Sequence, residues 1–372
     1  MVAVGSLPDC GIRLHHLELQ DVRLFVEAAL EVPMGGTTVL TGPNGSGKTT
    51  FLEAVAFLGS QRSFRTSVRE AMVRSGADRA ILRAELEHEK RPLLVESELL
   101  AKGAARTLVN HRMVRRRGAL AEAVPVTVFS PHDLGLVQGP PVRRRELLDT
   151  ALRLLDNRAA AHLDAMDRIL RQRAALLRQA GSKLSGEVAS TLDVWDGRLV
   201  VSGQAVSDAR RQLLADVQPA VEAAYERLVG VAAADGGVTM RYVPGWEGEL
   251  ADALCASRHD DIRRAASTVG PHRDEVALVI GGRDARVCAS QGEQRSLALA
   301  LRLGLHHLAT QRRGGAPLLL LDDVFSELDP DRSRALARLL PVGQALLTTA
   351  TPLPEGIEVS AVVDVRTLGR RA

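Results

Sequence analysis

The stretch that decides the fold is Gly42-Pro43-Asn44-Gly45-Ser46-Gly47-Lys48-Thr49. It fits the pattern G-x-x-x-x-G-K-[ST], whose glycines let backbone N–H groups turn inward around phosphates. The apolar run 37–40 precedes it, and residues 48–58 follow with apolar side chains at helical spacing. Because the motif requires this strand–loop–helix context, an ordinary glycine turn is disfavoured. The sequence therefore predicts that residues 42–50, including Thr50, bind ATP.

Two side chains of this loop have predicted chemical roles. Lys48 can reach the β- and γ-phosphates, and the Thr49 hydroxyl can ligate Mg²⁺. The N-terminus of the following helix adds positive partial charge, which favours bound anions.

A second motif, Leu318-Leu319-Leu320-Leu321-Asp322-Asp323, is typical of a buried parallel strand that ends in acids. We expect Asp322 to hold Mg²⁺, directly or through water, and Asp323 to orient or deprotonate the attacking water. The alternative is a helix N-cap after a core strand, and the phosphate loop disfavours it. Lys48, Asp322 and Asp323 are thus the candidate catalytic residues.

A third motif, Ser290-Gln291-Gly292-Glu293-Gln294, opens a predicted helix over 291–311. It resembles the signature motif of ATP-binding-cassette proteins, where the hydroxyl and helix-end amides face the γ-phosphate on the partner subunit. The alternative is a plain N-cap serine with a capping box to Glu293. Both can hold, because a cap and an anion site use the same geometry.

Two further segments complete the cassette pattern. Ser326-Glu327-Leu328-Asp329 resembles the D-loop, which in that superfamily lies across the dimer interface. Thr348-Thr349 occupies the place where many cassette ATPases carry a switch histidine, so the γ-phosphate sensor is left unassigned.

Composition excludes some functions and leaves others open. Hydrophobic residues make up 45% and charged residues 25%, a globular balance. Aromatic residues are only 3%, which disfavours a surface that stacks single-stranded bases. The net charge of +3 does not by itself indicate nucleic acid. Basic residues gather locally, however, and each cluster is either solvated surface or a DNA contact. The candidate DNA contacts are Arg62, Arg65, Arg115, Arg116, Arg117, Arg143 and Arg144.

The three cysteines, Cys10, Cys255 and Cys288, show neither a metal-binding spacing nor a disulfide framework. The sequence shows no secretory signal and no apolar run near the roughly 20 residues that span a bilayer. We expect a cytoplasmic protein without a membrane partner.

The pattern along the chain predicts an α/β ATPase head with an inserted helical lobe. Strand patterns cover 12–41 and 80–110, and strand–helix alternation returns after about Arg273 and ends near Leu347. Between them, apolar spacing predicts one long helix over 142–179 and a second over 192–228, forming an antiparallel hairpin. Residues 275–280 and 285–288 read as strands of a β-hairpin. We expect a split ATPase domain, 1–130 and 266–372, with 131–265 inserted.

The sequence resembles the RecF family of bacterial recombination mediators over nearly its whole length. The specific pieces are Gly270-Pro271-His272-Arg273-Asp274 and the run Leu321–Asp329, supported by Arg62-Ser63-Phe64-Arg65-Thr66 and Phe129-Ser130-Pro131. Asp21-Val22-Arg23-Leu24 departs from the family, since it lacks an expected aromatic residue. Residues 270–274 have a second interpretation as a buried turn in which Arg273 and Asp274 pair.

The resemblance implies a weak ATPase that binds duplex DNA and single-strand/duplex junctions as an ATP-sandwiched dimer. It implies a role in replication and recombinational repair, helping to load recombinase, with RecR and perhaps RecO as partners. The alternative is the nucleotide-binding subunit of a transporter. The wide separation of Lys48 from Ser290 disfavours it, because transporter subunits place these motifs much closer together.

Overall fold

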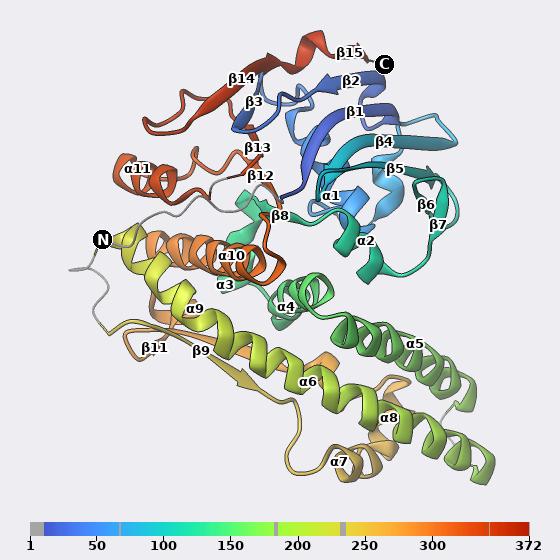
Figure 1. Cartoon of the computed structure of the whole chain (residues 1–372). Coiled ribbons are helices and arrows are strands. Elements are labelled where there is room, and N and C mark those ends of the chain that lie inside the picture. Colours follow the sequence, from blue (N-terminus) through green and yellow to red (C-terminus); the bar gives the residue numbers. More distant parts are fainter. Residues whose placement is uncertain (1–10, 67, 182–184, 231–235, 342, 372) are drawn as a thin grey trace. The chain divides into compact units, whose positions relative to one another are not determined.

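The computed structural model describes residues 11–66, 68–181, 185–230, 236–341 and 343–371 (Figure 1). The chain divides into two compact units. The first contains Met1–Leu134, Pro219–Asp235 and Ser290–Ala372, and the second contains Gly135–Gln218 and Gly236–Ala289. Residues 266–289 thus group with the second unit, whereas the sequence placed them with the ATPase domain. The physical reason is that β10 (Glu275–Ile280) pairs with β9 (Val238–Val243) of that unit.

A five-stranded parallel sheet positions the motifs of the first unit. Its strand order is β14 (Val359–Asp364), β3 (Thr37–Thr41), β13 (Ala345–Thr348), β12 (Leu318–Asp322) and β8 (Val126–Phe129). In such a sheet the carboxyl ends of all strands meet at one edge, where ligands bind. The phosphate loop after β3, the acids at the end of β12 and the threonines at the end of β13 therefore share an edge.

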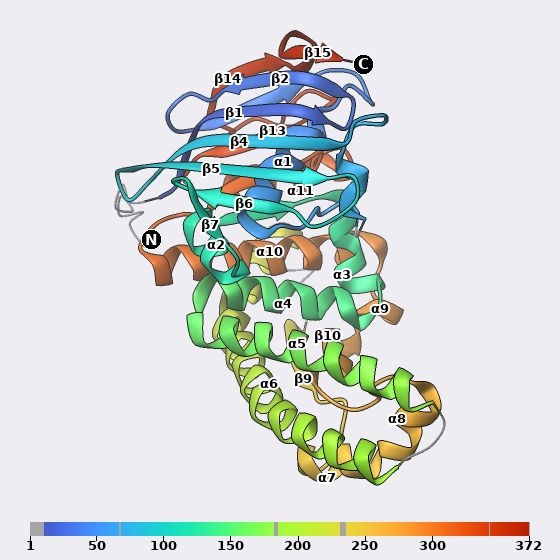
Figure 2. The same ribbon diagram turned by 90° about the vertical axis from the view of Figure 1, so that its right-hand side faces the viewer.

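A seven-stranded antiparallel sheet forms the other layer of this unit, and Figure 2 shows its strands side by side. Its strands alternate buried and exposed residues, so one face packs on the core. In order they are β15 (Gly369–Arg371), β2 (Phe25–Glu31), β1 (Arg13–Val22), β4 (Arg79–His88), β5 (Arg91–Leu100), β6 (Arg106–Val109) and β7 (Arg112–Val114). The sequence did not predict β14 or β15, because both are short and follow the last apolar run.

Helix α1 (Lys48–Ser60) contacts both sheets, which explains why it is apolar on nearly all sides. Gly59 lets α1 approach the backbone at Val124 closely, since a Cβ at position 59 would lie 2.4 Å from the Val124 carbonyl oxygen. The remaining helices of the unit are η1 (Arg69–Met72), α2 (Arg117–Ala123), η2 (Pro131–Asp133), α10 (Gln291–Arg313), α11 (Pro330–Leu339) and η5 (Val365–Thr367).

The second unit is mainly helical, with a small sheet of β11 (Arg283–Asp284), β10 and β9. The long helix expected over 142–179 is two helices, α4 (Pro141–Leu155) and α5 (Asn157–Ala180). They separate because the Asp156 side chain caps α5 by accepting from the amides of Arg158 and Ala159. Helix α6 (Gly186–Val229) follows, and it continues through Pro219, where the two units divide.

Shorter helices complete the second unit: α3 (Leu134–Gln138), α7 (Leu250–Ala256), α8 (Arg258–Arg264), η4 (Pro271–Arg273) and α9 (Ala285–Cys288). The expected strand over 285–288 is wrong, because the Asp284 side chain caps a helical turn there. Cys255 and Cys288 are exposed free thiols, and Cys10 lies outside the described residues. Across the described chain, no helix is long and apolar enough to cross a membrane.

Candidate nucleotide site

The phosphate loop has a backbone that only glycine adopts easily. Gly42, Gly45 and Gly47 have φ values of 143°, 78° and 92°. At Gly47 space is also lacking, since a Cβ would lie 2.6 Å from the Phe25 ring. The loop therefore turns tightly at the N-terminus of α1 and presents amide groups to a phosphate.

Lys48 lies across this loop and is 7% exposed. Its ammonium Nζ donates to the carbonyl oxygens of Gly42 and Pro43 at 2.7 and 3.1 Å. A cavity of about 420 Å³ lies beside the loop, and its lining residues are Thr41, Gly42, Pro43, Asn44, Thr349, Ala350 and Thr351. Three of the predicted loop residues, Gly42, Pro43 and Asn44, thus line a space of ligand size.

Asp322 ends β12 and is 6% exposed. Its Oδ1 accepts hydrogen bonds from the hydroxyls of Thr49 at 2.7 Å and Thr348 at 2.8 Å. Burial raises the pKa of the Asp322 carboxyl, and these two hydrogen bonds oppose the rise. The carboxylate is therefore held by neutral groups.

The Thr49–Asp322 pair fits Mg²⁺, because a hydroxyl and a carboxylate are the hard oxygen ligands that this ion prefers. No group of three or more His, Cys, Asp or Glu side chains among the described residues could hold a metal ion unaided. That is the usual situation for Mg²⁺, which takes one or two carboxylates together with phosphates of the substrate.

Asp323 has a strained backbone, with φ at 48°. Its amide donates to the Thr348 carbonyl and hydroxyl oxygens at 3.1 and 3.0 Å, which fixes the turn. Its Oδ1 is buried and has no hydrogen-bond partner among the described residues. Asp323 also lines a cavity of about 30 Å³, which has room for water. This geometry suits a carboxylate that orients water.

The threonines that replace the switch histidine have definite contacts. Thr348 bridges both acids, as described above. The Thr349 hydroxyl donates to the Thr351 carbonyl oxygen at 2.7 Å at the wall of the larger cavity. Thr348 is thus a positioning group for Asp322 and Asp323.

The signature-like motif begins α10, and the predicted capping box is present. The Glu293 amide donates to Ser290 Oγ at 3.3 Å, and Glu293 Oε2 accepts from the Ser290 amide at 2.8 Å. Ser290 and Gln291 are exposed, Gly292 and Glu293 are half-buried, and Gln294 is buried. The exposed start of this helix remains free for the second role, which stays a prediction.

The D-loop residues follow the acids directly. Ser326, Glu327 and Asp329 are exposed, and Leu328 is half-buried. Asp329 caps α11 by accepting from the Arg332 amide at 2.9 Å.

An ion-pair cluster behind the phosphate loop was not predicted. Glu53 of α1 is fully buried, and it accepts from Arg23 at 2.6 and 2.9 Å and from the Ser63 hydroxyl. Arg65 lies 3.6 Å from Glu53, and its charge lowers the pKa of Asp322. Arg65 therefore lies near the nucleotide site. The signal was a charged residue at a core position of α1.

The structure distributes the candidate DNA contacts over both units. Arg62, Arg65, Arg115 and Arg116 are exposed and Arg117 is half-buried in the first unit, and Arg143 is exposed on α4 of the second. Arg144 is different, with 6% exposure. It donates to Glu275 at 2.8 Å and to backbone carbonyls. Its predicted DNA contact is corrected, because its guanidinium is used inside the unit.

In the Gly270–Asp274 motif of the second unit, Gly270, Pro271 and Asp274 are buried and Arg273 is exposed. Arg273 and Asp274 do not pair. Arg273 and His272 contact the Ser267 carbonyl oxygen at 3.0 and 2.9 Å. Asp274 accepts from the hydroxyls of Tyr242 and Ser207 and from the Gly245 amide. The expected pairing is therefore wrong, since each side chain is committed to other groups.

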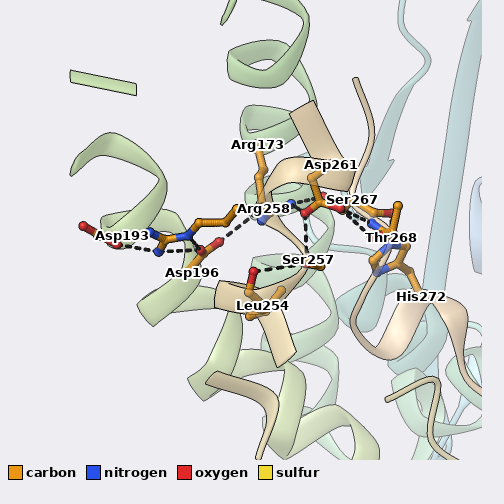
Figure 3. Close-up of polar contacts among 10 residues, drawn as sticks. All are labelled: Arg173, Asp193, Asp196, Leu254, Ser257, Arg258, Asp261, Ser267, Thr268 and His272. Atoms are coloured by element: carbon orange, nitrogen blue, oxygen red, sulfur yellow. Dashed lines mark hydrogen bonds and ion pairs between the residues drawn. The ribbon is translucent and has the colours of Figure 1, made fainter. Parts of the chain in front are cut away.

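A buried guanidinium lies next to this motif, as Figure 3 shows. Arg173 of α5 donates to Asp196 at 2.8 Å, to Asp261 at 2.6 Å and to the Ser267 hydroxyl at 2.7 Å. Arg258 donates to Asp196 as well. The network thus ties α5, α6 and α8 together within the second unit.

Known proteins resemble this chain in sequence and in fold. Residues 13–349 match the family model of the RecF/RecN/SMC N terminal domain. The DNA replication and repair protein RecF of Streptomyces avermitilis is 40% identical over 353 residues, 90% of this chain and 92% of the relative. RecF of Frankia alni is 38% identical over 91% of this chain and 93% of its own. A solved RecF–ATP structure shares the fold with a TM-score of 0.86 and 24% identity, covering 98% of both chains.

Proposed function

This chain belongs to the RecF family, and from that premise we propose that it is an ATP-dependent DNA-binding protein of replication and recombinational repair. Curated relatives such as that of Streptomyces avermitilis are DNA replication and repair proteins. One observation carries the proposal. The phosphate loop, Thr49 and Asp322 meet at one sheet edge, where the Thr49 hydroxyl donates to the Asp322 carboxylate and the first residues of the loop line a ligand-sized cavity.

In this proposal ATP acts as a reversible clamp with slow hydrolysis. Loop amides and Lys48 bind the phosphates. Thr49 and Asp322 would hold Mg²⁺, which neutralises phosphate charge when bound. Asp323 orients the attacking water, as its unpartnered Oδ1 and the adjacent small cavity support.

The clamp closes between two copies of the chain. Each composite site combines Lys48 and Asp322 of one copy with Ser290 of the other, and Ser290 is exposed at the start of α10. ATP favours the dimer to the extent that it binds the dimer more tightly than the monomer.

The proposed DNA partner is duplex and gapped DNA, read through its phosphates rather than its bases. The candidate contacts are the exposed arginines Arg62, Arg115, Arg116 and Arg143, with Arg65 and Arg117 beside them. RecR and RecO are the proposed protein partners, and recombinase loading is the proposed outcome.

Sedimentation velocity with duplex DNA, with and without Mg²⁺ and ATP, tests the proposal. We expect ATP to convert monomer to dimer and to increase the DNA that sediments with the protein. DNA binding should weaken steeply as salt increases, because arginine–phosphate contacts release counterions. A transporter subunit would ignore the DNA at every ATP concentration, and that result would overturn the proposal.

The composite site has a separate test. Ser290→Arg should leave ATP binding by the monomer intact and prevent the dimer, because the long side chain fills the space that the phosphate must enter. Mixed with Lys48→Met, it should regain partial ATPase activity, since one intact composite site forms. A mixture of folded chains without activity would contradict the composite site.

A further inference from the structure

One arginine outside every motif lies directly against the signature-like segment. Arg332, on the first turn of α11, approaches Gly292 so closely that a Cβ there would lie 2.7 Å from its Nη1 and 3.1 Å from its Nη2. The guanidinium therefore occupies the space that a side chain at position 292 would need. A side chain at position 292 would require this guanidinium to move.

The D-loop holds this guanidinium in place. Arg332 Nη1 donates to Asp329 Oδ2 at 2.7 Å, and Asp329 also caps α11 through the Arg332 amide. The side chain of Arg332 is 30% exposed and that of Asp329 is 44% exposed. An exposed ion pair such as that of Arg332 with Asp329 contributes little to stability. Stability therefore does not explain why the guanidinium is held against Gly292.

Arg332 also acts on the charge of the signature-like segment. The Glu293 carboxylate accepts from the Ser290 amide and from the Ser290 hydroxyl, the latter at 2.6 Å. Hydrogen bonds from Ser290 lower the pKa of Glu293, and the charge of Arg332 lowers it further. Arg332 thus stabilises the ionised Glu293 that holds Ser290.

A second arginine makes the reverse connection. Arg295, just after the signature-like segment, donates to the Glu327 carbonyl oxygen at 2.8 Å and pairs with its carboxylate at 3.1 Å. One arginine therefore reaches from α10 to the D-loop, and the other reaches from α11 to Gly292. The two segments form one connected polar block.

We propose that Arg332 is a positioning residue that sets Ser290 and Gly292 against the D-loop, so that both meet the γ-phosphate bound by the partner copy. Its positive charge offsets Glu293 and Asp329, two carboxylates that would otherwise repel an arriving triphosphate. This inference rests on the proposed ATP-sandwiched dimer. It predicts that Arg332 acts in trans, on the nucleotide held by the other chain.

Arg332→Ala provides the test. The variant should bind ATP as a monomer with unchanged affinity, since its own phosphate loop is intact. Its ATP-driven dimerisation and ATPase activity should fall by about 100-fold, the order of loss that a small misplacement causes. Arg332→Lys keeps the charge without the planar fork and should recover only part of the loss.

Arg334→Ala is the matched control, because Arg334 lies on the same helix and forms a comparable pair with Asp331 at 2.5 Å. It should behave like the unmodified chain, since no contact joins Arg334 to the signature-like segment among the described residues.

Mixing decides whether Arg332 acts in trans. Arg332→Ala with Lys48→Met should regain activity, because the first chain supplies an intact phosphate loop and the second an intact signature. If this mixture stays inactive while Ser290→Arg with Lys48→Met is active, Arg332 acts on the nucleotide of its own chain. The role in trans is then contradicted, and the composite site stands. If both mixtures stay inactive, the composite site is contradicted, and the role of Arg332 in trans is contradicted with it. Normal ATP-driven dimerisation of Arg332→Ala would also overturn it.

Discussion

Two buried carboxylates, one in each unit, are held in opposite ways. Asp261 of the second unit is fully buried and lies 2.6 Å from the guanidinium of Arg173, with Thr268 donating two further hydrogen bonds. Asp322 of the first unit is almost as buried, but its hydrogen bonds come from the hydroxyls of Thr49 and Thr348. No basic side chain within the described ranges forms an ion pair with Asp322.

The difference supports the proposal that Asp322 is a functional acid, whereas Asp261 is a structural one. A buried charge is costly unless it is paired, and the second unit pairs Asp261 internally. The first unit gives Asp322 no ion-pair partner among the described residues, and burial raises its pKa, although the more distant charge of Arg65 opposes the rise. Such a site gains most from a cation that arrives with the nucleotide. Perturbed acids that lack an internal partner therefore indicate function more strongly than buried ion pairs do.

The largest expected effect concerns the phosphate loop. Lys48→Met should weaken ATP binding by more than about 100-fold, because a charge that faces phosphates is lost. Isothermal titration calorimetry measures the affinity. The variant should remain folded by circular dichroism, since the Lys48 ammonium contacts only loop carbonyls. Unchanged affinity would remove this loop from the nucleotide site.

Arg173→Met tests whether the ion pair between Arg173 and Asp261 stabilises the second unit. Removing this guanidinium leaves the buried Asp261 carboxylate without its ion-pair partner, so the free energy of unfolding should fall by about 3–5 kcal/mol. Denaturant unfolding measures it. Arg168→Met, at an exposed position of the same helix, is the control and should change stability by less than about 0.5 kcal/mol. Equal losses in the two variants would show that the buried network is not a structural support.

Asp323→Asn tests the water-orienting role. ATP binding should persist, while turnover under single-turnover conditions should fall by about 100-fold because the charge is lost with little change in volume. The ATP-bound dimer should last longer in consequence. Turnover at the unmodified rate would assign the role to another acid.

The smallest effect is on stability, and its sign is diagnostic. The folded state raises the pKa of Asp322, so the unfolded chain ionises first as pH rises, and stability is lost between the two pKa values. Asp322→Asn removes this loss. At about pH 7 the variant should be at least as stable as the unmodified chain, and any difference should vanish in acid. Strong destabilisation in urea would place Asp322 with the structural acids.

Local patterns predicted the local structure of the candidate nucleotide site because each motif is contiguous. The loop, the acids after β12 and the capping box of Ser290 and Glu293 all lie where the sequence placed them. The threonine bridge from Thr348 to Asp322 was not predicted, since it joins separate strands.

The second unit was harder to predict because its polar residues are paired through tertiary structure. Arg173 follows Met166 and Ile169 at helical spacing on the buried face of α5, which was a usable signal for a core guanidinium. Its partners Asp196 and Asp261 lie on other helices, and no local pattern connects them. The break at Asp156 was missed for a related reason, since apolar spacing continues across it.

The most direct test of the proposed role of Asp322 in holding Mg²⁺ is thermal unfolding in the presence of ATP at increasing Mg²⁺ concentrations. It compares the unmodified chain with Asp322→Asn. A ligand that binds only the folded state raises the unfolding temperature. In the unmodified chain, we expect Mg²⁺ to raise the unfolding temperature above its value with ATP alone, and a chelator should reverse this increase. In Asp322→Asn, Mg²⁺ should not raise it further. An equal Mg²⁺ increment in both proteins would contradict the proposed role of Asp322.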